Sequence, residues 1–202
     1  YDYDHGCTDR FQVAMNSVMT FAELFLSEKN TKNKVALIGF NAEENRDEND
    51  GYGTYFTNNL TRINNRINKM YENLNKGTDY GDAMSAASAM LAERKAELGA
   101  EFDKKKTYVL FLTDGVPSPT SATGIPEARN LKNTYKNTTV YAIGIGNQED
   151  EDFADKYLKD IASSEDTCIR IEQESELVDK FEDIAHSLVY VGKDVTLEDK
   201  IS

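Results

Sequence analysis

Ten consecutive residues decide the fold of this chain: Tyr108-Val109-Leu110-Phe111-Leu112-Thr113-Asp114-Gly115-Val116-Pro117. An unbroken apolar run of this kind is typical of a strand that is buried on both faces of a parallel sheet. The run stops abruptly at an aspartate and a glycine, so the strand delivers the Asp114 carboxylate to the edge at which parallel strands end. Open α/β sheets bind their ligands at that edge.

A second polar segment stands earlier in the chain and leads into an expected helix at 82–98. It is a glycine-rich turn, Asn75-Lys76-Gly77-Thr78-Asp79-Tyr80-Gly81-Asp82-Ala83. We expect Thr78 and Asp114 to meet at one rim, and we interpret Asp79 and Asp82 as helix-start carboxylates favoured by the helix dipole. The alternatives are that Asp114 is only a turn residue and that Thr78 only caps the helix.

The apolar periodicity of the whole chain predicts strands alternating with helices. Strands are expected at 34–40, 53–57, 107–113, 138–146 and 168–171, and helices at 11–26, 60–70, 82–98, 126–132, 153–162 and 174–189. Such alternation indicates parallel βαβ units, while the strand at 53–57 follows its predecessor closely enough to return antiparallel. The predicted fold is an open, doubly wound, mostly parallel α/β sheet with one antiparallel edge strand and helices on both faces.

Length and charge restrict the classes of partner. We expect one domain over 1–190 and, over 191–202, an exit segment toward a following domain. The chain carries 36 acidic against 23 basic side chains, which argues against nucleic acid and anionic membranes and favours a cationic ligand or divalent metal. The sequence contains no apolar run of the roughly 18 residues that a membrane helix needs, so we expect no membrane insertion.

The chain offers little for catalysis. It lacks a phosphate-binding Gly-x-x-x-x-Gly-Lys loop, and its histidines, His5 and His186, belong to no motif with a nucleophile. We therefore expect a binding protein and no enzyme, since a hydrolase or nucleotide enzyme would need an acid–base pair. Tyr52, Tyr55 and Tyr80 are the tyrosines that we expect near the rim, as candidate ligand contacts.

Four segments, at 35–40, 77–83, 107–117 and 140–146, together resemble the von Willebrand factor A-type domain. The most specific element is Leu112-Thr113-Asp114-Gly115 in combination with Gly77-Thr78. The resemblance spans roughly residues 10–189 and implies the Rossmann-like fold of that family. The acidic loop at 41–50 and the exit at 195–197 most resemble A-type domains of Gram-positive surface and pilus-tip adhesins.

The resemblance implies a metal-ion-dependent adhesion site. Thr78 matches the family's threonine ligand and Asp114 its aspartate ligand for magnesium, manganese or calcium, and a carboxylate of the partner completes the cation's coordination. It thus implies cell adhesion to a host matrix or cell-surface protein by an extracellular bacterial adhesin, anchored to the wall through segments outside this chain. The alternative is an intracellular module that mediates protein interactions in a chaperone or chelatase assembly.

One part of the family's pattern has no counterpart here. The family's first strand and its Asp-x-Ser-x-Ser loop precede the helix that begins near Arg10, yet residues 1–9 contain no serine and no apolar strand. We expect the first strand and its loop to lie upstream of Tyr1, and not to have been lost from the protein, because deleting a central strand would uncover apolar faces of its neighbours.

The first prediction concerns that upstream sequence. We expect a strand of about four to seven apolar residues followed by Asp-x-Ser-x-Ser, because the helix at 11–26 matches the one that follows this loop. Sequencing the gene upstream of Tyr1 checks it, and a polar linker there would contradict the adhesion-site interpretation.

The second prediction is that Cys7 and Cys168 form no disulfide. Cys7 precedes a helix at the edge where the strands end, whereas Cys168 opens a strand and belongs near the opposite edge. A disulfide tolerates only about 7 Å between Cα atoms. Titration of the unfolded, unreduced monomer should find both thiols, and finding neither would refute the prediction.

Overall fold

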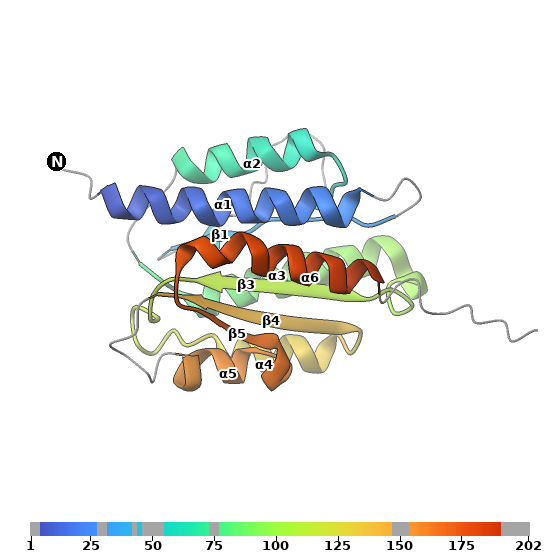
Figure 1. Ribbon diagram of the computed structural model, residues 1–202. Helices are drawn as coiled ribbons and strands as arrows, with labels where there is room; N and C mark the ends of the chain where they lie inside the picture. The colour runs from blue at the N-terminus through green and yellow to red at the C-terminus, as the bar shows by residue number, and fades with distance from the viewer. Residues whose placement is uncertain are drawn as a thin grey trace, which may run out of the picture.

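The computed structural model describes residues 5–27, 32–41, 44–45, 55–72, 77–146 and 154–190. The described strands form a three-stranded sheet, in the order β3-β4-β5, and a separate two-stranded sheet, β1-β2. Helices lie on both faces of the larger sheet (Figure 1).

The larger sheet is parallel throughout, as predicted. β3 (Thr107–Thr113) pairs with β4 (Thr138–Ile145), and β4 pairs with β5 (Cys168–Ile171). Thr113 stands opposite Gly144, so Asp114 follows directly at the edge where the strands end. The predicted bounds of β3 and β5 are the observed ones.

The helices also follow the prediction, with shifted ends. They are α1 (His5–Leu26), α2 (Leu60–Glu72), α3 (Tyr80–Leu98), α4 (Ile125–Thr134), α5 (Lys159–Ile161) after a π-helical turn (Ala154–Leu158), and α6 (Leu177–Tyr190). In Figure 1, α1 and α6 lie in front of the sheet, whereas α3 lies behind it. The chain is therefore wound on both faces, which is the predicted fold class.

Each face of the sheet has its own apolar core because side chains alternate along β4. Val140 and Ala142 pack with buried side chains of α3, α4 and α5. Ile143 and Ile145 pack on the other face, where Phe21 of α1 and Phe181 of α6 also lie. A continuous apolar run such as that of β4 is what burial on both faces requires.

The N-terminal half of the sheet differs from the prediction. Of the strand expected at 34–40, only β1 (Gly39–Phe40) is formed, and the expected loop at 41–50 contains β2 (Glu44–Asn45), which pairs antiparallel with β1. Val35 makes an antiparallel bridge with Thr57 through two backbone hydrogen bonds of 2.7 and 2.8 Å. Residues 51–54 lie outside the described residues, so the antiparallel edge strand at 53–57 stays a prediction.

β3 is an edge strand within the described part of the chain, although its composition is that of an interior strand. No described strand bonds to the edge of β3 that faces away from β4. Thr107 to Leu110 are only half-buried, whereas β4 is buried from Ala142 to Ile145. On the side of β1, the ring of Phe40 stacks on that of Phe111 at 5.2 Å between centroids.

The two cysteines belong to opposite ends of the sheet. Cys168 is the first residue of β5, and α1 begins at the edge where the strands end (Figure 1). The side chain of Cys7 lies outside what the structure describes, so the absence of a disulfide stays a prediction.

Lys132 connects α4 to the end of α5, and this connection generates a third prediction. Its Nζ donates to the carbonyl oxygens of Asp160, Ile161 and Ala162 at 3.0, 2.9 and 2.7 Å. Hydrogen bonds from a charged group contribute roughly 1.5–3 kcal/mol. We expect Lys132→Met to lower the free energy of unfolding by about 1–2 kcal/mol, because the side chain is only partly buried.

Urea denaturation measures this loss, with Lys136→Met as the matched control. Lys136 lies on the surface just after α4, and its Nζ reaches only the exposed Asn133 at 3.2 Å. Equal losses for the two variants would contradict the role given to Lys132.

Candidate functional site

The candidate site is the rim where β3 ends, α3 begins and β1 ends. The backbone around Thr78 is held from both neighbouring loops. Thr78 forms an antiparallel bridge with Ser118, whose amide donates to the Thr78 carbonyl at 2.9 Å, and the Asp79 amide donates to the Asn41 carbonyl at 2.6 Å. The start of α3 is thus fastened both to the turn after β3 and to the end of β1.

The structure brings Thr78 and Asp114 to the same place. A Cβ placed on Gly115 would lie 3.8 Å from the Thr78 Oγ1, so this hydroxyl is beside the residue that follows Asp114. Asp114 is exposed and Thr78 is half-buried. The expectation that they share one rim is therefore met, while their role as metal ligands stays a prediction.

The cap of α3 is Asp79, not Thr78. The Asp79 side chain accepts a hydrogen bond from the Asp82 amide at 2.9 Å, and Asp82 lies in the first turn of the helix. Both carboxylates are thus helix-start residues, as predicted. The capping alternative for Thr78 is excluded, because the capping position belongs to its neighbour.

Tyr80 lies at the rim, but its role there differs from the predicted one. We expected it to contact a ligand, yet it is fully buried and its hydroxyl donates to the Gly115 carbonyl. Burial raises the pKa of this phenol; the neighbouring Thr113 hydroxyl opposes the shift and the nearby Asp114 charge adds to it. No signal in the sequence marks this contact, because it joins residues 35 positions apart.

The other two candidate ligand contacts are Tyr55 and Tyr52. Tyr55 is partly buried, and its carbonyl accepts a hydrogen bond from the buried Arg66. Tyr52 lies outside the described residues.

The oxygens at the rim are chemically suited to a hard cation. A threonine hydroxyl and an aspartate carboxylate are ligands of the kind that magnesium takes, and magnesium commonly keeps several waters while bound by one or two carboxylates. Within the described residues, no group of three or more His, Cys, Asp or Glu side chains is placed to hold a metal. Thr78 and Asp114 therefore fit a cation in kind but supply only part of a ligand set.

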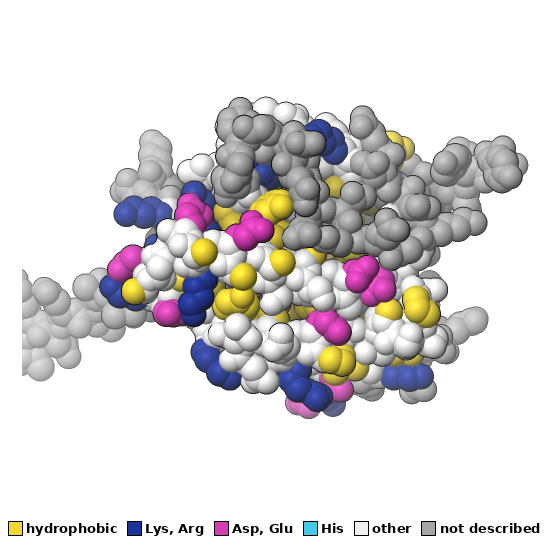
Figure 2. All heavy atoms as spheres, turned by 180° about the vertical axis from the view of Figure 1, so that it is seen from behind, with side chains coloured by type: hydrophobic (Ala, Val, Ile, Leu, Met, Phe, Trp, Pro, Cys, Tyr) yellow, Lys and Arg dark blue, Asp and Glu magenta, His cyan; other side chains and the backbone are white. Residues whose placement is uncertain are grey.

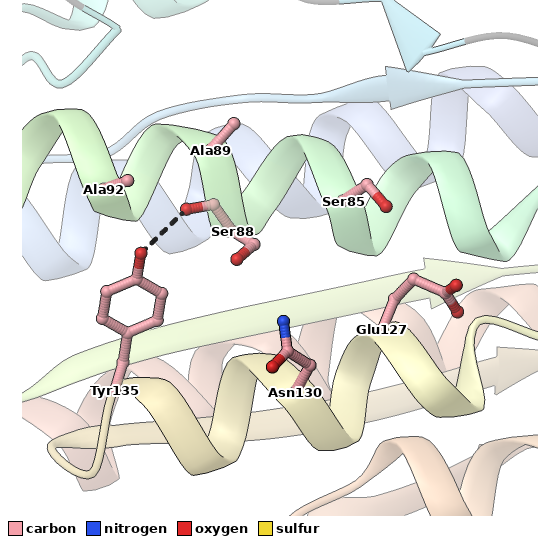
Figure 3. A pocket seen from close by; sticks show the side chains of 7 residues that line it. All are labelled: Ser85, Ser88, Ala89, Ala92, Glu127, Asn130 and Tyr135. Atoms are coloured by element: carbon pink, nitrogen blue, oxygen red, sulfur yellow. Dashed lines mark hydrogen bonds between the residues drawn. The ribbon is translucent and has the colours of Figure 1, made fainter.

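A separate hollow of about 270 Å³ lies between α3 and α4, away from Thr78 and Asp114. Figure 3 shows Ser85 and Ser88 of α3 facing Asn130 and Glu127 of α4 across it, while the Tyr135 hydroxyl donates to the Ser88 carbonyl at 3.2 Å. The space-filling view from behind shows acidic and basic side chains interspersed over that face (Figure 2). Neither Thr78 nor Asp114 lines this hollow, so the rim is a separate part of the surface.

None of the described helices is long and apolar enough to cross a membrane.

One comparison with known proteins identifies a domain family. The sequence model of the von Willebrand factor type A domain matches residues 8–184. No curated protein sequence matches the chain. The fold is similar to that of the pilus adhesin SpaC of Lactobacillus rhamnosus GG in its open conformation, with a TM-score of 0.67 and 15% identity over 91% of this chain and 28% of that one.

A second similar structure comes from the mussel byssus. Proximal thread matrix protein 1 has a TM-score of 0.58 and 19% identity over 88% of this chain and 40% of its own, and a second crystal form gives 0.56. The chain therefore spans less than half the length of either protein.

Proposed function

Because the chain belongs to the von Willebrand factor type A domain family, we propose that it binds a protein ligand at the Thr78–Asp114 rim through a divalent cation. The observation that carries the proposal is the juxtaposition of the Thr78 hydroxyl with the segment that bears Asp114. Magnesium, manganese or calcium would supply a coordination position for an acidic side chain of the partner, as a bridge and not as a catalyst.

The two residues would contribute differently. Asp114 supplies a negative charge at an exposed position, whereas the half-buried Thr78 supplies a neutral oxygen. A neutral ligand leaves more of the cation's charge uncompensated than a second carboxylate would. That remaining charge would attract an acidic side chain of the partner.

Because the whole chain is negatively charged, an acidic partner would need this attraction in order to bind. With a net charge of −13, the bare protein repels an acidic partner. A cation at the rim reverses the sign of the potential locally, where contact is made. Ligand binding should consequently depend on the cation far more than on the rest of the surface.

We place this binding on the outside of a bacterial cell, in a Gram-positive surface or pilus adhesin. The fold similarity to a pilus adhesin supports the setting, although the chain spans only 28% of that protein. Host matrix or cell-surface proteins are the partners that we propose for a cation at this rim. Segments outside this chain would anchor the protein to the wall. A binding role without catalysis accords with the sequence, which contains no recognisable acid–base pair.

The fourth prediction concerns magnesium. The chain as given should bind it weakly or not at all, because Thr78 and Asp114 are only part of a ligand set and magnesium gives up its waters reluctantly. A longer version that includes the upstream loop should bind it. In that version Asp114→Ala should abolish binding while changing the free energy of unfolding by less than about 0.5 kcal/mol, since substitutions at exposed positions usually change stability by no more than this.

Calorimetric titration of both lengths measures this, with Asp103→Ala as the matched control. Asp103 is also an exposed aspartate flanking β3, but it lies before the strand and pairs with Lys95 at 3.2 Å. Tight magnesium binding by the chain as given, or equal losses for the two variants, would show that other residues hold the metal. In the longer version, retention on immobilised matrix proteins should be abolished by EDTA and by Asp114→Ala.

A further inference from the structure

We propose that Tyr80 is a positioning residue of the rim: its hydroxyl holds the turn after β3 against the start of α3 and thereby sets the separation of Thr78 and Asp114. This inference rests on the proposed function, and it concerns a residue that touches neither the cation nor the partner.

The ring of Tyr80 is buried for reasons that do not require its hydroxyl. It packs edge to face against Phe111 at 4.9 Å and against Phe40 at 6.3 Å between centroids. A phenylalanine would make the same contacts. Burying a hydroxyl instead costs free energy unless it finds a hydrogen-bond partner, so the partner of the Tyr80 hydroxyl is the informative feature.

That partner is the carbonyl of the residue directly after Asp114. The Gly115 oxygen accepts from the Tyr80 hydroxyl and also from the Thr113 Oγ1 at 3.1 Å. The two donors fix the orientation of the backbone on the C-terminal side of Asp114. A turn without the tyrosine donor would be freer to rotate, and the carboxylate would move with it.

The main chain of Tyr80 is itself held by the loop that precedes α4. Its amide donates to the Ala122 carbonyl at 3.2 Å, and Gly124, with a φ of +66°, approaches so closely that a Cβ there would lie 2.8 Å from the Tyr80 Cβ. Thr78 stands only two residues earlier on the same fastened segment. The Tyr80 hydroxyl therefore connects the segment that contains Thr78 to the turn that carries Asp114.

Replacing Tyr80 by phenylalanine removes this connection and keeps the ring. The Ser118 amide, which donates to the Thr78 carbonyl, would then be the nearest main-chain link between the turn and the start of α3, with the Tyr80–Ala122 bond farther along the loop. We expect the Ser118 amide to exchange with solvent about five- to tenfold faster, the effect of one lost hydrogen bond. In the longer version that includes the upstream loop, affinity for Mn²⁺ should fall by a similar factor.

The chain offers a closely matched control in Tyr135→Phe. Tyr135 is also a buried tyrosine whose hydroxyl donates to a backbone carbonyl, that of Ser88 at 3.2 Å, but it lies beside the α3–α4 hollow and away from the rim. Both variants lose one buried hydroxyl, so they should lose similar stability. Only Tyr80→Phe should speed the exchange of the Ser118 amide by more than the loss of global stability explains. Only Tyr80→Phe should weaken Mn²⁺ binding.

The experiment measures free Mn²⁺ by electron paramagnetic resonance, which detects weak binding, and amide exchange by NMR. If the Ser118 amide exchanges at the same rate in Tyr80→Phe as in Tyr135→Phe, the positioning role of Tyr80 is overturned. The Mn²⁺ measurements use the longer version that includes the upstream loop. If that version and its Asp114→Ala variant bind Mn²⁺ equally, the proposed cation site fails, and Ser118 exchange still decides the role of Tyr80. Faster exchange with unchanged Mn²⁺ affinity would also overturn the inference, because the turn would move without affecting the ligands.

Discussion

The architecture of the rim depends on how the segment from Thr78 to Tyr80 is fastened. Its backbone bonds to Asn41 after β1, to Ser118 after β3 and to Ala122 before α4. These bonds join loops that follow different parts of the sheet, and the Tyr80 hydroxyl adds a side-chain link to Gly115. Since an unpaired buried polar group is costly, each of these bonds resists displacement of the segment. The exposed Asp114 is in this way carried by a turn whose surroundings are rigid.

The parts of the structure that were predictable from sequence are those determined by local pattern. The bounds of β3 followed from an apolar run that ends at Asp114-Gly115, and α3 followed from its alanine-rich periodicity and acidic first turn. The meeting of Thr78 with the Asp114 segment was expected because a glycine-rich turn leads into a helix and open α/β sheets bind their ligands at the edge where β3 ends. None of these inferences needed knowledge of a distant contact.

The predictions that failed each depended on a partner that local pattern does not specify. The segment at 34–38 has the composition of a strand, but a strand requires a hydrogen-bonded neighbour, and the described residues offer it only the bridge from Val35 to Thr57. Tyr80 was expected to be a candidate ligand contact near the rim. It is buried instead, since Phe40 and Phe111 enclose its ring and the Gly115 carbonyl satisfies its hydroxyl.

The edge of β3 that no described strand pairs with and the partial ligand set at the rim are two aspects of the same geometry. A strand added in parallel along that edge would end beside Asp114, and α1 begins at the same edge of the sheet (Figure 1). The loop joining such a strand to α1 would therefore lie next to Thr78 and Asp114. Pairing with β3 would cover its half-buried side chains, and the same event would add ligands to the rim. Cation binding and sheet completion would then be thermodynamically linked, because a cation that binds only the completed form stabilises the added strand by the free energy of its own binding.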